Sequence, residues 1–417
     1  MEIRPLTADD LDAVLDNRRR AFGIIPAGDL EDWRAQVVPV LEAGRYLGVA
    51  DGPRLIATSR INDFTQWWHG RPISMGGVAS VTVAPEDRGR GVGRMLLRAT
   101  VDRCAELGHP VSALYPAATR VYRSLGWEHA GALHRATFPA EALRAIGPAE
   151  RSAVRRMGPG DAAEVIEIMG RVHAGARASG PICWDERTWR LWLEEEDDFL
   201  YLAGDGFVIY RWDGDDIEVD TLLAGSEATA RTLWSLVGSS SSIATSVRAI
   251  VAPDDPVFWL IGERKKDEVT QTRWMFRVID LPAAVAGRGF PDGVTLDTVV
   301  RVEDPHRPAN SGAWRLSVRG GTGEARPAEA PPGSVPVLTA GGFSALFAGV
   351  PAATLHRSGT LTVPRGPASP DASGASGAPD ASGASGAPDA PDVPGASGVL
   401  GALETAFRAT PYMLDAF

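Results

Sequence analysis

VTVAPEDRGRGVGRMLL, residues 81–97, is the stretch that decides the fold. Its alternating start predicts a strand, the proline and glycines predict a turn, and the apolar residues from Val92 onward predict a helix. Arg88, Gly91 and Gly93 form the spacing Arg-x-x-Gly-x-Gly. Glycines allow close backbone approach, and the free N–H groups at a helix N-terminus favour negative charge. The segment therefore suits a diphosphate.

The residues on either side of this stretch predict a mixed α/β unit that spans 1–145. A hairpin is expected around Asp51-Gly52-Pro53, and Gly108 and Pro110 end the helix that the glycine turn begins. The predicted order is strand 2–6, helix to Phe22, strands 46–50, 55–61 and 78–84, helix 92–107, and strands 111–115 and 127–136.

The same pattern starts again at Val154, which predicts a second unit over 146–290 by degenerate duplication. A strand at 154–157 precedes a helix at 162–173, and a hairpin turns at 204–206. The counterpart of the glycine turn, 224–228, reads AGSEA, with no arginine and with a carboxylate that would repel phosphate. The strand 274–280 is expected to close this unit.

The remaining residues, 291–417, predict a smaller α+β unit that contains one low-complexity insertion, 364–398. The segment DASGASGAP at 371–379 is repeated at 380–388. Because such residues cannot form an apolar core, the insertion is predicted to be solvated and disordered.

Composition excludes several classes of function. The chain has 417 residues and a formal net charge of −11, and its basic residues are scattered among carboxylates, so nucleic acid is a poor partner and a cationic small molecule a good one. We expect no membrane span and no signal peptide, which together suggest a cytoplasmic protein. Cys104 and Cys183 have no zinc-like spacing, and no metal is expected.

The strand, turn and helix at 81–97 resemble the acyl-CoA-binding motif of the GNAT N-acetyltransferases. A Rossmann reading fails because the required glycine spacing and downstream acidic residue are missing. The resemblance implies acetyl-CoA as cosubstrate, with pantetheine on the backbone of the strand and pyrophosphate on the turn. The implied contacts are Val81, Val83, Arg88, Arg90, Gly91 and Gly93.

The whole chain is similar to a narrower family, the Eis (enhanced intracellular survival) acetyltransferases. That resemblance implies tandem GNAT domains, the second of them degenerate and unable to bind CoA, followed by a sterol-carrier-protein-like α+β domain. It also implies assembly as a homohexamer.

Two groups are candidates for moving protons. Tyr122 stands where GNAT enzymes often keep a tyrosine near the thioester sulfur, and a phenol can act as general acid. The strand 79–84 has no carboxylate that could act as base, and the resemblance to Eis points to the α-carboxylate of Phe417. The apolar tail from Pro411 to Phe417 suits burial.

Other residues compete for these roles. His69, His129 and His134 are rival bases because imidazole titrates near neutrality. Trp33, Trp67 and Trp68 are candidate pocket walls for a cationic amine, or else ordinary core residues. The acidic residues Asp29, Glu31 and Asp32 could attract the same amine.

The sequence thus predicts an acetyl-CoA-dependent N-acetyltransferase that acts on primary amines of aminoglycosides, polyamines or lysine side chains. The alternative is a non-catalytic scaffold that binds a lipid or another ligand in the sterol-carrier-like domain. Binding of acetyl-CoA separates the two hypotheses.

Overall fold

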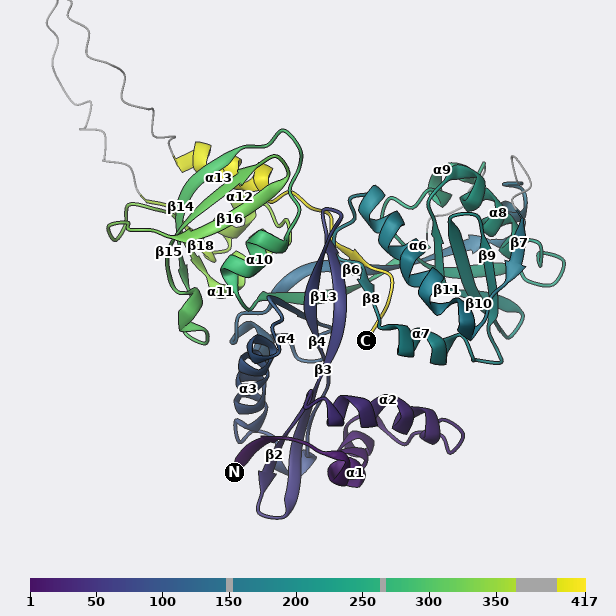
Figure 1. Ribbon diagram of the computed structural model, residues 1–417, viewed down its shortest axis with the longest axis horizontal. Helices are drawn as coiled ribbons and strands as arrows, with labels where there is room; N and C mark the ends of the chain where they lie inside the picture. The colour runs from purple at the N-terminus through teal and green to yellow at the C-terminus, as the bar shows by residue number, and fades with distance from the viewer. Residues whose placement is uncertain (148–152, 263–267, 365–395) are drawn as a thin grey trace, which may run out of the picture.

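A computed structural model describes residues 1–147, 153–262, 268–364 and 396–417. Two long strands, β3 and β4, run from the lower lobe into the centre of the molecule, where the other two lobes meet (Figure 1). The predicted combination of α/β and α+β units is confirmed. Within the described residues, no helix combines the length and apolar character that crossing a membrane requires.

The first unit follows the predicted order closely. Leu96, Leu97 and Val101 lie on one side of helix α3 and are buried against the sheet, as their spacing requires. Strand β3 is longer than expected and continues to Trp68. The elements are β1 (Glu2–Pro5), α1 (Leu11–Phe22), α2 (Leu30–Glu42), β2 (Tyr46–Asp51), β3 (Arg54–Trp68), β4 (Arg71–Val83), α3 (Val92–Glu106), β5 (Val111–Leu114), α4 (Thr119–Arg123), β6 (Glu128–Pro139) and α5 (Ala140–Arg144).

The second unit repeats this order, and side-chain caps define three of its helices, since Asp280 also accepts a hydrogen bond from the Ala283 N–H at the start of α10. Asp185 accepts a hydrogen bond from the Thr188 N–H at the start of α7, and Ser226 accepts one from the Thr229 N–H at the start of α8. The elements are β7 (Val154–Arg156), α6 (Ala162–Gly175), β8 (Ile182–Cys183), α7 (Glu186–Trp192), β9 (Phe199–Ala203), β10 (Gly206–Asp213), β11 (Asp216–Ala224), α8 (Glu227–Gly238), β12 (Ser246–Val251), α9 (Val257–Leu260), β13 (Glu268–Val278) and α10 (Leu281–Gly287).

One continuous sheet joins the first two units. Its order is β1-β2-β3-β4-β5-β13-β6-β12-β11-β10-β9-β7, so β13 lies between β5 and β6 of the first unit. Met275 pairs with Leu114 on one side and His129 on the other. Strand β13 falls within the proposed second unit, 146–290, yet it completes the sheet of the first.

The third unit is a five-stranded sheet, in the order β16-β15-β14-β17-β18, covered by helices. The predicted insertion 364–398 lies almost wholly outside the described residues. The elements are β14 (Leu296–Glu303), β15 (Gly312–Arg319), β16 (Thr322–Pro327), β17 (Val337–Thr339), α11 (Ala340–Phe347), α12 (Ala352–Arg357), β18 (Leu361–Thr362), α13 (Ala396–Ala406) and the tail strand β19 (Tyr412–Met413).

An arginine fills the centre of the third unit. Arg288 is fully buried, and its guanidinium lies 4.8 Å from the ring centre of Phe290 and 5.3 Å from those of Phe347 and Phe407. It donates hydrogen bonds to the carbonyls of Phe347 and Phe407. Burial lowers its pKa to about 9. The protein's own aromatic side chains therefore fill the space around Arg288.

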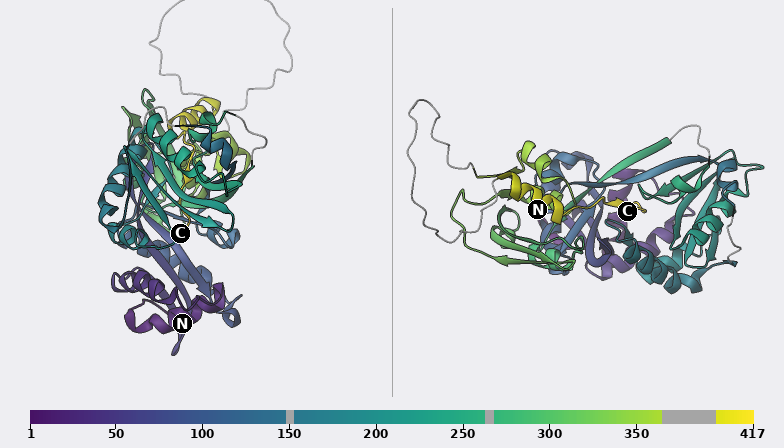
Figure 2. Two further views of the ribbon diagram at one scale, coloured as in Figure 1. Left: turned by 90° about the vertical axis from the view of Figure 1, so that its right-hand side faces the viewer. Right: turned by 90° about the horizontal axis from the view of Figure 1, so that it is seen from above.

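The tail returns from the third unit to the first. Strand β19 pairs in parallel with β6, and the Tyr412 N–H donates to the Ser179 carbonyl of the second unit. Both views in Figure 2 show the C-terminus in the interior of the molecule, between the lobes. The last residues therefore contact the first two units.

Candidate active site

The glycine turn between β4 and α3 is open. Gly89 and Gly91 have φ values of +79° and +80°, a region that favours glycine, and a Cβ on either would meet no atom within 4 Å. Gly91 caps α3 without any side-chain hydrogen bond, and no acidic residue occupies the first turn. The N–H groups at this helix start can donate to an anion, and no side chain fills the space beside Gly89 and Gly91.

The predicted arginines differ in their surroundings. Arg88 is exposed, and its Nε donates to the Val83 carbonyl at 3.3 Å. Arg90 instead pairs with Asp87, whose side chain is 3% exposed and also accepts from Arg54 at 2.9 Å. The buried Asp87, which no pattern in the sequence singles out, fixes the turn through these two arginines. To bind a phosphate, Arg90 must release the Asp87 carboxylate or contact both groups at once.

The edge of β4 beyond Gly77 provides backbone groups. Strands β4 and β5 pair only from Met75↔Val111 to Gly77↔Ala113, and the edge of β4 that follows faces no other strand within the described residues. The β3–β4 register shifts near Thr58, and Ser80 has a φ of +50°. This bulge turns the segment that carries Val81 and Val83, both half-buried.

Tyr122 lies on the α3 side of the point where β4 and β5 diverge. Its ring belongs to the buried cluster that contains Val78 and Leu114, and it meets Trp127 edge-on at 6.2 Å. Its hydroxyl makes no hydrogen bond within the described part of the chain. Burial raises the pKa of the phenol to about 12, so it remains a proton donor at neutral pH.

Phe417 lies on the other side of the sheet. Its ring packs 4.8 Å from Phe64 and 5.6 Å from Tyr115, and its Cε2 lies 2.9 Å from where a Cβ on Gly77 would be. A Cβ at this position would collide first with the Phe64 ring, so glycine leaves room for the packed pair of Phe64 and Phe417. Successive strand residues face opposite sides of a sheet. Phe417 packs against Gly77 and Tyr122 packs in the cluster of Val78, so the two residues lie on opposite faces of the sheet at the point where β4 and β5 diverge.

The rival bases lie elsewhere. His129 and His134 line a groove between β6 and the α11–α12 region. The backbone N–H of His69 donates a hydrogen bond to the Ser179 hydroxyl. Burial lowers the pKa of all three imidazoles. None of them is brought to Tyr122 or Phe417 by a described contact.

Two of the three tryptophans named as pocket walls, Trp67 and Trp68, are core residues, and Trp33 is half-buried. Trp68 is fully buried, Trp67 is 5% exposed, and Trp33 packs beside a separate apolar cluster. Trp67 and Trp68 are buried because β3 extends across the centre of the molecule (Figure 1), which local sequence does not reveal.

Other tryptophans line the cavity beside the tail. This cavity has a volume of about 420 Å³, and Trp184 also lines a smaller neighbouring cavity that contains Asn62 and Asp63. Burial raises the pKa values of Asp198 and Asp415 to about 6. The walls include Trp184, Trp189, Trp192, Glu195, Asp198, Asp220 and Asp415, with Arg135 and Arg211.

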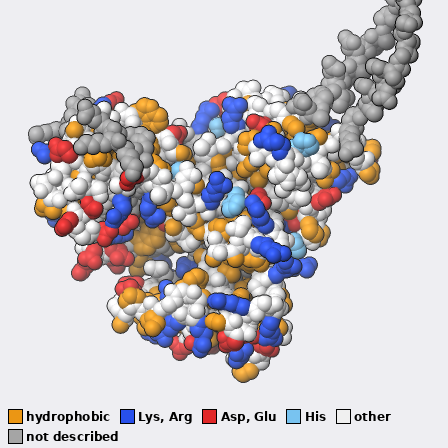
Figure 3. Space-filling model, turned by 180° about the vertical axis from the view of Figure 1, so that it is seen from behind, with side chains coloured by type: hydrophobic (Ala, Val, Ile, Leu, Met, Phe, Trp, Pro, Cys, Tyr) orange, Lys and Arg blue, Asp and Glu red, His pale blue; other side chains and the backbone are white. Residues whose placement is uncertain are grey.

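The adjoining cavity is acidic. Asp32 of α2 faces Glu194, Glu195 and Glu196 across a volume of about 310 Å³. Seen from behind, acidic side chains gather along the edge of the second unit that faces the first (Figure 3). The run EEEDD at 194–198 was the signal in the sequence that could have identified this wall.

Comparisons with known proteins agree with this geometry. Family models of an acetyltransferase (GNAT) domain match residues 2–130 and 180–278, and a sterol carrier protein domain matches 281–378. An N-acetyltransferase Eis of Mycobacterium bovis is 27% identical over 61% of this chain, and the match spans 66% of that relative's length.

Solved structures extend the likeness over the whole chain. A GCN5-related N-acetyltransferase from Kribbella flavida is 44% identical, with a TM-score of 0.89, over 100% of this chain and 98% of that one. Eis1 from Mycobacterium abscessus shares the fold at 20% identity, with a TM-score of 0.72 over 100% of both chains.

Proposed function

Because the chain belongs to the Eis-like GCN5-related N-acetyltransferase family, we propose that it transfers acetyl groups from acetyl-CoA to primary amines of polycationic molecules. Aminoglycosides, polyamines and lysine side chains are the candidate substrates. The observation that carries the proposal is the placement of Tyr122 and Phe417 on opposite faces of the divergence of β4 and β5, next to an open glycine turn.

The proposed chemistry needs one proton acceptor and one donor. Acetyl-CoA, held by the turn and by the free edge of β4, supplies the activated acetyl group. The α-carboxylate of Phe417, directly or through a water, takes the proton that the attacking amine loses as its nitrogen bonds the carbonyl carbon. Tyr122 gives its proton to the sulfur as the carbon–sulfur bond breaks. The products are an amide and free CoA thiol. The Phe417 carboxyl then releases its proton to solvent, and solvent returns a proton to the phenol.

The polycationic class is supported by the cavities beside the tail. Ammonium groups are stabilised both by carboxylates and by tryptophan faces, and both types of side chain line these cavities. Arg211 already pairs with Asp198 and Asp220, whereas the exposed Glu194, Glu195 and Glu196 lie at the mouth. We expect molecules with several amines to react with a lower KM than monoamines of equal length.

The experiment that tests the proposal measures thiol release with a series of mono-, di- and polyamines. A variant with one glycine appended after Phe417 should lose at least about 100-fold in kcat, because the carboxylate is displaced from the thioester. Near-normal kcat would remove Phe417 as the base. The scaffold alternative requires that acetyl-CoA show no saturable binding in equilibrium titration.

The homohexamer that the resemblance implies is part of the same proposal. Mass photometry should give a particle of six 44.2 kDa chains. A monodisperse monomer would contradict it.

A further inference from the structure

The helical turn that carries Tyr122 is too short to be stable without contacts to the rest of the protein. Helix α4 has five residues, and an isolated helix of this length is not stable in water. The Tyr122 carbonyl accepts hydrogen bonds from the N–H groups of Leu125 and Trp127, at 3.0 and 3.2 Å. The position of Tyr122 therefore depends on what holds residues 125–127.

Arg277 of β13 holds these residues. Its guanidinium donates to the Leu125 carbonyl and lies 5.7 Å from the ring centre of Trp127, which in turn meets the Tyr122 ring. Gly126 has a φ of +91°, and a Cβ there would overlap the Arg277 guanidinium. Arg277 thus occupies the space directly beneath the turn.

Asp304 of the third unit fixes Arg277 in turn. One guanidinium nitrogen donates to both Asp304 oxygens at 2.9 Å, and the two side chains are 0% and 1% exposed. The backbone N–H groups of His306 and Arg307 also donate to Asp304 Oδ1, and the Asn310 amide donates to Oδ2. A buried ion pair depends on such hydrogen bonds, because desolvation of both charges is costly. The Arg277 Nε has no hydrogen-bond partner within the described residues.

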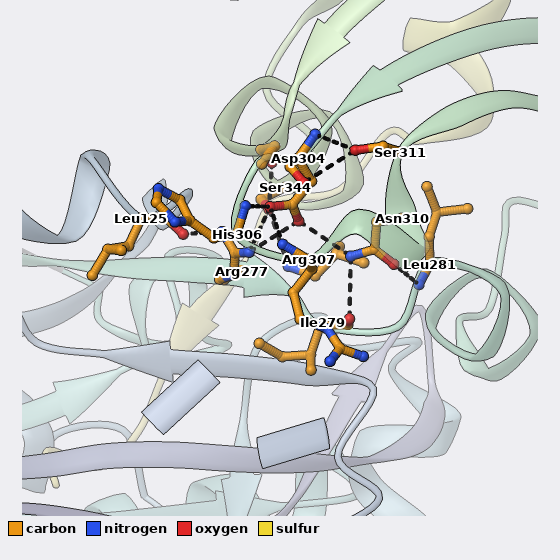
Figure 4. Close-up of polar contacts among 12 residues, drawn as sticks. Leu125, Arg277, Ile279, Leu281, Asp304, His306, Arg307, Asn310, Ser311 and Ser344 are labelled. Atoms are coloured by element: carbon orange, nitrogen blue, oxygen red, sulfur yellow. Dashed lines mark hydrogen bonds and ion pairs between the residues drawn. The ribbon is translucent and has the colours of Figure 1, made fainter. Parts of the chain in front are cut away.

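A second contact joins the same loop to the turn. His306 Nε2 lies 3.0 Å from the Ser124 carbonyl, which can accept its proton in the Nε2–H tautomer. Figure 4 shows Arg277 between Leu125 and Asp304, with His306 beside them. The loop at 304–311 therefore contacts the acid-bearing turn directly through His306 and indirectly through the Asp304–Arg277 pair.

We propose that Arg277 and Asp304 are positioning residues for Tyr122, so that acetyl transfer by the first unit depends on the third. This inference rests on the proposed function, since it assumes that Tyr122 protonates the leaving sulfur. It assigns the sterol-carrier-like unit a role as the support of a catalytic side chain.

The test is a double-mutant cycle between Arg277 and Tyr122. Lysine at 277 keeps the charge beside Asp304 but lacks the planar fork that reaches Leu125 at the same time. Arg277→Lys should lower kcat about tenfold or more, with the KM for acetyl-CoA changed by less than about twofold. In a Tyr122→Phe background the same substitution should change kcat by less than about twofold, because the group it positions is gone.

Two other variants complete the design. His306→Ala removes the partly exposed contact without disturbing the buried pair, and it should show the same dependence on Tyr122. It decides the question if Arg277→Lys does not fold. Asp297→Asn breaks an exposed pair with Arg315 in the same unit and should leave kcat unchanged.

Each outcome has a distinct meaning. Equal losses of kcat in both backgrounds would overturn the positioning role, because the pair would then act on the fold as a whole. Unchanged kcat in Arg277→Lys and in His306→Ala would overturn it too. If Tyr122→Phe alone retains full kcat, the proposed acid fails instead, whatever the other variants show.

Discussion

At the scale of single residues, Tyr122 combines a buried ring with a hydroxyl that has no hydrogen-bond partner within the described residues. Burial disfavours the phenolate and raises its pKa to about 12. The phenol is therefore protonated throughout the neutral range, and its own titration should not limit kcat between about pH 6 and pH 9.

Replacing this one hydroxyl separates chemistry from binding. Tyr122→Phe should reduce kcat by about 10²-fold or more, because the departing sulfur loses its proton donor, while the affinity for acetyl-CoA changes little. Steady-state thiol release and equilibrium titration measure the two effects. Tyr201→Phe, the same change on a tyrosine stacked against Tyr210 in the second unit, is the control. Equal losses in kcat and affinity would count against the acid role.

At the scale of elements, the two ends of α3 offer a matched comparison. Gly91 and Gly108 flank the helix with φ values of +80° and +79°, and a Cβ on either would meet no atom within 4 Å. Alanine at either should destabilise the fold by about 1 kcal/mol through the same backbone strain.

Only one of these glycines faces the proposed phosphate site. Gly91→Ala should raise the Kd of acetyl-CoA at least about fivefold, because the methyl group occupies the phosphate approach, whereas Gly108→Ala should leave the Kd unchanged. Isothermal titration measures both. Similar Kd values for the two variants would mean that the turn does not hold the pyrophosphate.

Helix α6 contains a histidine whose burial links stability to pH. His173 is 1% exposed, and burial lowers its pKa from 6.5 to about 4. The unfolded chain therefore binds more protons than the folded chain between pH 6.5 and 4. The contribution of neutral His173 to the free energy of unfolding is complete above pH 6.5 and is lost as the pH falls toward 4. The loss by pH 4 amounts to roughly 3 kcal/mol in the free energy of unfolding.

Urea unfolding between pH 7 and pH 4.5 measures this effect. The wild-type chain should lose stability steeply on acidification, and His173→Gln, which cannot be protonated, should show a shallower slope. The same slope in both proteins would place the acid sensitivity in other groups, such as the buried His109.

At the scale of the whole molecule, the proposed base is held by groups from all three units. The tail leaves the third unit, Trp184 of the second unit donates to the Asp415 carboxylate, and the Tyr115 hydroxyl of the first donates to the Asp415 carbonyl at 2.9 Å. Burial raises the Tyr115 pKa, which keeps this hydroxyl a donor.

Loosening the tail should expose its end. Tyr115→Phe combined with Trp184→Phe removes both hydrogen bonds and keeps aromatic rings at both positions. Carboxypeptidase should release Phe417 at least about tenfold faster from this variant than from the wild type, and kcat should fall in parallel. If release remains equally slow, β19 and the ring contacts hold the tail without these two hydrogen bonds.

Local sequence was sufficient for the strand, turn and helix at 81–97 and for the mixed α/β and α+β character, because glycine positions and apolar spacing report backbone geometry directly. The tandem GNAT and sterol-carrier-like architecture came from the resemblance to a known family. The family and the fold that the sequence indicated are confirmed by the comparisons. The roles of Tyr122 and Phe417 stay predictions, although the structure brings both residues to the divergence of β4 and β5. The acidic run at 194–198 is visible in the sequence, but the sequence does not show that Asp32 lies across a cavity from it.

Tertiary structure alone decided the insertion of β13 between β5 and β6, the burial of Trp67 and Trp68, and the pairing of Arg277 with Asp304. Each of these depends on contacts between residues that are far apart in the chain. The spacing of apolar residues along the sequence indicates which side chains face a core. It does not indicate which distant element packs against them. The support beneath Tyr122 depends on such a distant element. Asp304, which fixes Arg277 under the turn, lies in a different unit, and no sequence pattern links it to that turn.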